Sequence, residues 1–131
     1  MRSTTFILDT SAYSVAQRGD ERLLALLDEA QHIYIPVIVI GELLGGFAHG
    51  TKAAENKRNL TKFLADPVVS VLYIGGETPG YFAEIYAELR RAGRSIGQND
   101  LWIAALAREH QLALLTIDND FSVASELEII D

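Results

Sequence analysis

Short runs of β-branched and apolar residues alternate with helical segments along this chain, and no hairpin dipeptide joins one run to the next. Parallel strands require a crossover between them, usually a helix, and a parallel sheet is buried on both faces. The alternation therefore predicts an α/β fold in which right-handed crossovers place helices on both faces of a central parallel sheet of four or five strands. Such an arrangement is a three-layer sandwich.

The expected elements follow from hydrophobic spacing and from capping residues. Expected strands cover residues 4–8, 33–35, 68–74 and 113–116, and the tail 128–130 is a candidate fifth strand. Expected helices cover residues 11–17, 20–30, 36–47, 52–64, 78–91 and 100–111. Pro36 is predicted to open its helix, and Thr78 and Asn99 are predicted N-caps. No linker or repeat divides the 131 residues, so we expect a single domain over residues 1–131.

The composition excludes several classes of chemistry. The chain has no cysteine, which rules out disulfides, a thiol nucleophile and cysteine-ligated zinc. No apolar run approaches the roughly 18 residues of a membrane-spanning helix, and the first residues lack the plan of a signal peptide. We therefore expect a cytoplasmic protein without a membrane partner, in which any metal is bound by oxygen or imidazole.

The net charge of -7 argues against simple electrostatic binding of nucleic acid, which normally shows as a basic excess. Seven of the eleven basic residues nevertheless fall in two clusters: Lys52, Lys57, Arg58 and Lys62, then Arg90, Arg91 and Arg94. These clusters are either a basic rim that contacts RNA phosphates around an acidic pocket or two ordinary solvated helix faces. The sequence does not decide between the two.

Four acidic residues stand at the ends of expected elements: Asp9, Glu42, Asp100 and Asp118. Taken singly, Asp9 is more typical of an N-cap, and Asp100 of a residue that complements a helix dipole. Together, however, two strand ends and a helix start can meet at the C-terminal edge of one sheet, and Glu42 can reach the same crevice from the neighbouring helix. The sequence thus predicts one carboxylate site.

Carboxylates within about 4 to 6 Å of each other repel unless a cation lies among them. Mg²⁺ or Mn²⁺ accepts oxygen ligands, activates water and polarises phosphoryl oxygens, which is the chemistry of phosphodiester hydrolysis. Our hypothesis is that Asp9 and Asp100 ligate the metal, and that Glu42 and Asp118 complete its shell and position the water. Asp120 is a candidate for the outer shell of the metal, and residues that could orient the carboxylates or donate to phosphate are Thr10, Ser11, Asn99 and Thr116.

Four short segments carry a family resemblance. They are Asp9-Thr10-Ser11, Gly41-Glu42-Leu43, Asn99-Asp100-Leu101-Trp102-Ile103-Ala104-Ala105 and Thr116-Ile117-Asp118-Asn119-Asp120-Phe121. They resemble the four motifs of PIN domains, in particular VapC-type toxins, and the match spans essentially the whole chain. The resemblance implies a PIN-like fold and a magnesium- or manganese-dependent endoribonuclease that cuts RNA. It also implies a homodimer inhibited by a cognate VapB-like antitoxin.

The expected helix 36–47 carries more apolar surface than one face requires, including Val37, Ile38, Leu43 and Leu44. Burial within one subunit is the simpler interpretation, and a dimer contact or an antitoxin groove is the alternative. Among the aromatic residues, Tyr13, Tyr81, Tyr86 and Trp102 are candidates for base stacking, although Trp102 lies in an apolar helix typical of a core.

Other functions remain as alternatives. A phospho-accepting receiver domain or an aspartyl phosphatase would need a late lysine, and no lysine follows Lys62. A non-catalytic PIN-like binding or assembly module would show no metal-dependent cleavage. A PIN nuclease of RNA processing, outside any toxin-antitoxin system, has the same acidic set, and nothing in the sequence distinguishes RNA from DNA as the substrate.

Overall fold

The computed structural model describes residues 4–118, 121 and 129–130. Its sheet is entirely parallel, with the strand order β3-β2-β1-β4-β5. The strands are β1 (Thr5–Leu8), β2 (His32–Pro36), β3 (Val69–Leu72), β4 (Ala113–Leu115) and β5 (Ile129–Ile130). The predicted parallel sheet is confirmed, and residues 129–130 of the tail do pair with β4 as a fifth strand.

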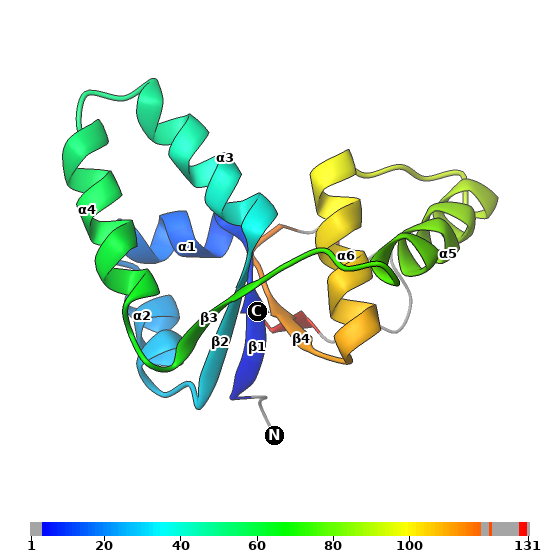
Figure 1. Ribbon diagram of the computed structural model, residues 1–131, viewed down its shortest axis with the longest axis horizontal. Coiled ribbons are helices and arrows are strands. Elements are labelled where there is room, and N and C mark those ends of the chain that lie inside the picture. Colours follow the sequence, from blue (N-terminus) through cyan, green and yellow to red (C-terminus); the bar gives the residue numbers. More distant parts are fainter. Residues whose placement is uncertain (1–3, 119–120, 122–128, 131) are drawn as a thin grey trace.

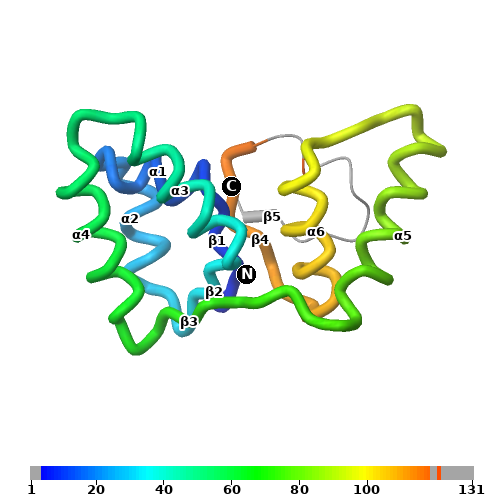
Figure 2. Tube along the Cα trace, turned by 45° about the horizontal axis from the view of Figure 1, so that its top comes forward, coloured from blue at the N-terminus to red at the C-terminus, as the bar shows by residue number. Residues whose placement is uncertain are grey.

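Helices cover both faces of this sheet, as predicted. One layer holds α1 (Thr10–Gln17), α2 (Glu21–Asp28), α3 (Val37–Ala48) and α4 (Ala53–Leu64), and the other holds α5 (Thr78–Arg91) and α6 (Gln98–His110). Figure 1 shows the two helical layers on opposite sides of the strands, and the turned view in Figure 2 shows the same separation. The architecture is therefore the expected PIN-like three-layer sandwich.

The core lies around the central strands because these are covered from both sides. Phe6, Ile7 and Leu8 of β1 are almost completely buried, as are Leu114 and Leu115 of β4. α6 is also buried in the core, in part through small side chains: Ala104, Ala105 and Ala107. Burial on both faces explains why the strands appear in the sequence as continuous apolar runs.

The predicted helix over residues 78–91 is confirmed, but the predicted roles of Pro36, Thr78 and Asn99 at the helix N-termini are each wrong by one or two residues. Pro36 ends β2 and is the N-cap of α3, where its extended backbone (ψ 143°) still belongs to the strand. Glu77 rather than Thr78 caps α5, and the Thr78 hydroxyl accepts from the Gly75 amide and donates to Glu109. Gly97 caps α6, so Asn99 lies inside the first helical turn and its side chain is available for another contact.

The strand order creates a switch point between β1 and β4. The chain runs from β1 outward to β2 and β3, then crosses to the other side of β1 to form β4 and β5. In open α/β sheets, a crevice forms at the carboxyl ends of the strands where the winding direction reverses. Here that position belongs to the residues that follow Leu8 and Leu115. Among the described residues, no helix has both the length and the apolarity to cross a membrane.

Candidate active site

The switch point brings together two segments that are far apart in sequence. β1 and β4 pair in parallel with Leu8 opposite Leu115, so Asp9 and Thr116 are the next residues on each strand. The Asp9 amide donates to the Leu115 carbonyl at 3.3 Å, which continues the pairing for one more residue. The two side chains consequently lie side by side at the carboxyl edge of the sheet.

The Asp9 carboxylate is only 3% exposed and is held by three hydrogen-bond donors. Its Oδ1 accepts from the Ala12 amide at 2.9 Å and from the Ser11 hydroxyl at 3.0 Å. Its Oδ2 accepts a short hydrogen bond from the Thr116 hydroxyl, and the Thr116 Oγ1 in turn accepts from the Asp118 amide at 2.9 Å. Asp9 is thus the N-cap of α1, as the simpler interpretation predicted, and also the centre of a polar network.

Burial raises the pKa of the Asp9 carboxyl above its ordinary value of 3.8. Hydrogen bonds from Thr116, Ala12 and Ser11 act in the opposite direction, and the nearby Asp118 charge adds to the rise in pKa. The pKa is raised despite these three hydrogen-bond donors, so the ionised form of Asp9 is less favourable in this environment than in water.

Glu42 is the centre of a second network on the other side of the crevice. Its Oε1 accepts from the Thr10 hydroxyl at 2.6 Å, and its Oε2 faces the Asn99 amide nitrogen at 3.3 Å. These contacts join α1, α3 and the first turn of α6. Asp100, the next residue after Asn99, is half-buried in that first turn.

The predicted site residues therefore fall into two networks that meet at the consecutive residues Asp9 and Thr10. The first contains Asp9, Ser11, Thr116 and Asp118, and the second contains Thr10, Glu42 and Asn99. Asp120 lies outside the described residues. Within the described part of the chain, no three acidic or histidine side chains are grouped closely enough to hold a metal ion.

The basic clusters do not form a continuous rim. α4 and α5, which carry most of these residues, lie at opposite ends of the molecule (Figure 1). Lys57, Arg58 and Lys62 line a shallow surface on α4, and the Arg90 guanidinium lies over the Tyr86 ring. Of the α4 cluster, only Lys52 reaches the cavity described next.

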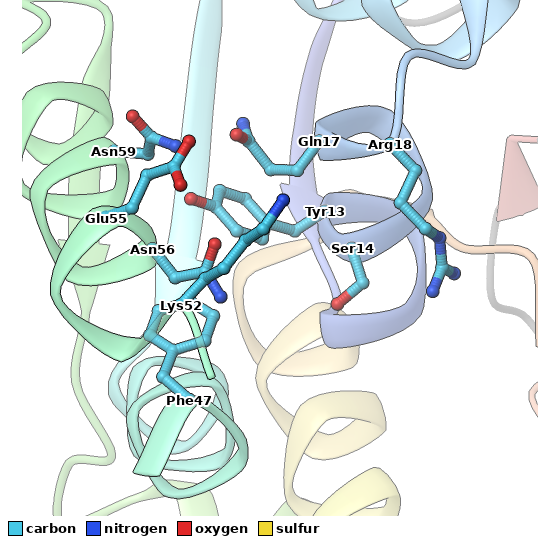
Figure 3. Close-up of a pocket in the computed structure, with 9 residues that line it drawn as sticks. All are labelled: Tyr13, Ser14, Gln17, Arg18, Phe47, Lys52, Glu55, Asn56 and Asn59. Atoms are coloured by element: carbon cyan, nitrogen blue, oxygen red, sulfur yellow. The ribbon is translucent and has the colours of Figure 1, made fainter. Parts of the chain in front are cut away.

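A cavity of about 660 Å³, not predicted from the sequence, lies between α1 and α4, and we call it the α1–α4 cavity. Figure 3 shows its lining, which consists of Tyr13, Ser14, Gln17, Arg18, Phe47, Lys52, Glu55, Asn56 and Asn59. One sequence feature could have pointed to this cavity. The spacing of Thr10, Ser14 and Gln17 puts three polar residues on one helix face. Tyr13, a predicted base-stacking residue, is instead buried with its ring against Phe63.

Trp102, the other aromatic residue singled out in the sequence, is half-buried and not fully enclosed. Its ring packs against Phe82 with a centroid distance of 4.3 Å, and Phe82 stacks in turn on Tyr86. The expectation of a core role for Trp102 therefore holds in part, since this aromatic row joins α5 to α6 while leaving Tyr86 exposed.

Comparisons with known proteins agree with the fold. The PIN domain family profile matches residues 6–127. Ribonuclease VapC5 of Mycobacterium tuberculosis is 30% identical over 129 residues, covering 95% of this chain and 93% of the relative. Ribonuclease VapC2 of Rickettsia felis is 30% identical over 115 residues, covering 85% and 84%. The crystal structure of VapBC2 from Rickettsia felis bound to a promoter DNA fragment superposes with a TM-score of 0.85 at 27% identity, covering 96% of this chain and 97% of that one. This chain belongs to the PIN domain family.

Proposed function

We propose that this protein is a metal-dependent endoribonuclease, the toxin of a VapBC-type toxin-antitoxin pair. The observation that carries the proposal is the buried Asp9 carboxylate beside Asp118 at the switch point of the sheet, with its pKa raised by burial and by that neighbouring charge. Relatives that align over most of this chain are named ribonucleases, which supports RNA as the substrate.

The donor set fits a hard divalent cation, for which we propose Mg²⁺ or Mn²⁺. Both networks offer only carboxylate, hydroxyl and amide groups, and oxygen ligands are those that these ions prefer. We assign Asp9, Asp100 and Asp118 as ligands, directly or through water, with Glu42 completing the shell. When bound, the metal would supply Lewis-acid polarisation of the phosphoryl oxygen and lower the pKa of a water molecule.

The remaining residues position these carboxylates. Thr116 and Ser11 donate to Asp9, so both carboxylate oxygens point in fixed directions, and the Thr116 hydroxyl also fixes the backbone at Asp118. Thr10 and Asn99 donate hydrogen bonds to the two carboxylate oxygens of Glu42 and fix their directions in the same way. Glu42, held from both sides, is placed to accept a proton from an attacking water. We propose Asp120 as an outer member of the site on its sequence position alone.

We further propose a homodimer and a VapB-like antitoxin partner. The apolar surface of α3 is only partly used within the subunit: Val39 and Leu43 are buried, whereas Val37 is 38% and Leu44 is 40% exposed. These two residues lie seven apart and so share one helix face. Leaving such a face in water is unfavourable, which supports its burial by a second chain.

The proposed activity is tested with purified protein, freed of any bound partner, and a labelled structured RNA pool. We expect cleavage in Mg²⁺ or Mn²⁺, none in EDTA, and none of single-stranded DNA with the same sequences. Activity should return when the metal is added back, because the carboxylates are intact. Cleavage that persists in EDTA would contradict the metal site, and absence of cleavage of every RNA would favour a binding module.

Replacing Thr116 by Val should reduce the rate of cleavage about 10- to 100-fold, the usual effect of losing a group that orients a metal ligand. Val keeps the β-branched shape but removes the hydrogen bond that lowers the pKa of Asp9. The acidic limb of the pH–rate profile should therefore move to higher pH. Thr116→Ser retains the hydroxyl and serves as the control, with a profile like that of the wild type. An unchanged profile for the Val variant would exclude this role.

A further inference from the structure

The Tyr13 hydroxyl at the α1–α4 cavity is unexplained by the packing of the fold. Tyr13 is 2% exposed, and its ring meets Phe63 edge-on with a centroid distance of 5.4 Å. Within the described part of the chain, its hydroxyl oxygen is buried and has no hydrogen-bond partner. Phenylalanine would pack equally well and would avoid burying an unsatisfied polar group. The hydroxyl is thus better explained by a ligand than by the core.

The hydroxyl is directed toward a set of polar side chains. In Figure 3 it points from α1 toward α4, near Glu55 and Asn56, with Gln17 on the opposite side of the cavity. The amides of Gln17, Asn56 and Asn59 each offer both donors and acceptors. The cavity can therefore recognise a ligand that presents both hydrogen-bond donors and acceptors along one edge.

The charge and shape of the cavity favour an anionic ligand with a planar part. Arg18 and Lys52 line it with one acid, Glu55, in a chain where acids outnumber bases by 18 to 11. Phe47 adds an aromatic ring, on which a base can stack. Its volume of about 660 Å³ lies within the range of pockets that enclose a small organic ligand.

The cavity and the two acidic networks share helices α1 and α3. α1 carries Thr10 at the acidic end and Ser14 and Gln17 on the same face, and α3 carries Glu42 and then Phe47. At about 1.5 Å of rise per residue, Ser14 and Gln17 lie roughly 6 to 10 Å along α1 from Thr10. A strand of RNA cut at the acidic end would place a neighbouring nucleotide at the cavity.

We propose that the α1–α4 cavity is a nucleobase subsite, which holds one unstacked base of a single-stranded RNA beside the scissile phosphate and sets the sequence preference of cleavage. This proposal rests on the proposed ribonuclease function. Tyr13, Gln17, Asn56 and Asn59 read the base edge, Phe47 stacks on the base, and Arg18 and Lys52 bind the flanking phosphates. Single-stranded RNA is recognised in general by such splayed, stacked bases.

The test is cleavage of an RNA oligonucleotide pool with randomised positions around the cut, followed by sequencing of the product ends. The variants are Tyr13→Phe, Gln17→Ala and Asn59→Ala. Gln31→Ala is the control, because Gln31 is exposed and lies just before β2, at the amino ends of the strands. The proposed active site lies at their carboxyl ends. We expect each cavity variant still to cleave RNA but to lose nucleotide preference at the same position relative to the cut. The preference ratio should fall by about 3- to 10-fold per lost hydrogen bond. Tyr13→Phe should have a melting temperature no lower than the wild type.

The outcomes separate the subsite from the function on which it rests. If all three cavity variants cleaved RNA at the wild-type rate and with the wild-type sequence preference, the subsite proposal would be overturned. The proposed ribonuclease function would stand. Cavity variants that keep the preference but no longer bind the cognate antitoxin would assign the cavity to the protein partner instead. A wild type that cuts no RNA in the pool would overturn both proposals.

Discussion

Asp9→Asn is expected to abolish metal-dependent cleavage and, in the same protein, to raise the melting temperature at neutral pH in EDTA. The loss of activity should be about 100- to 10,000-fold, because the carboxylate at the centre of the site is replaced by a neutral amide. The gain in stability follows from burial, which makes the ionised Asp9 less favourable in the folded protein than in the unfolded chain. Asn remains a good N-cap, so the hydrogen bond from Ala12 can be kept.

The stability gain should depend on pH in a defined direction. The folded protein holds the Asp9 proton more tightly than the unfolded chain, so it binds more protons in the window between the ordinary pKa of 3.8 and the raised value. The free energy of unfolding contributed by Asp9 therefore falls as the pH rises through that window, and the cost is fully present above it.

Melting temperatures of the wild type and Asp9→Asn, measured in EDTA at a series of pH values, check this sign. The difference should be largest at neutral pH and should vanish at pH values below the ordinary pKa of Asp. Asp28→Asn is a matched control for the chemical change, because Asp28 is exposed near the end of α2 and its replacement should leave the cleavage rate unchanged. A less stable Asp9→Asn protein at neutral pH would show that its hydrogen bonds outweigh the desolvation of the charge.

Asp100→Asn is expected to lower the rate of cleavage by a similar factor, about 100-fold or more, with the opposite effect on stability. Asp100 lies in the first turn of α6, where a negative charge interacts favourably with the helix dipole. Its replacement should cost roughly 0.3 to 1 kcal/mol of stability. The two variants thus lose the same activity while the melting temperature rises in one and falls in the other.

The measurement is single-turnover cleavage of one RNA substrate at saturating metal, together with thermal unfolding of the same samples. If Asp100→Asn cleaved at the wild-type rate, Asp100 would be a helix-capping charge only, and the metal would have to be held by the remaining acids. A partial loss at the metal concentration that saturates the wild type, restored at higher concentrations, would identify Asp100 as a ligand that contributes metal affinity more than chemistry.

The strands could be predicted from the sequence because burial on both faces imposes a continuous apolar run, as in Phe6-Ile7-Leu8 and Leu114-Leu115. The acids at the ends of these strands were identifiable for the same reason, since a polar residue directly after such a run lies at the edge of the sheet. Helix starts were less predictable. Thr78 and Asn99 have side chains that favour capping, but each bonds to a distant acid instead: Glu109 and Glu42.

The α1–α4 cavity could not be predicted from the sequence. Its lining comes from α1, α3 and α4 and from residues at their ends. The relative placement of these helices depends on the tertiary packing of α3 and α4 and not on local sequence. The sequence shows that Gln17 and Asn59 are polar and helical, which is equally typical of solvated surfaces. That the Tyr13 hydroxyl has no partner among the described residues can be recognised only once the side chain is known to be buried.

The position of β4 beside β1 also determines when the site is completed during synthesis. Asp9 is synthesised before Thr116, which donates to it and is made 107 residues later. Until β4 forms, β1 has an open edge, and the Asp9 network lacks both Thr116 and Asp118. A nascent chain that holds only β1, β2 and β3 is therefore expected to be inactive toward the messenger RNA and the ribosome that are producing it.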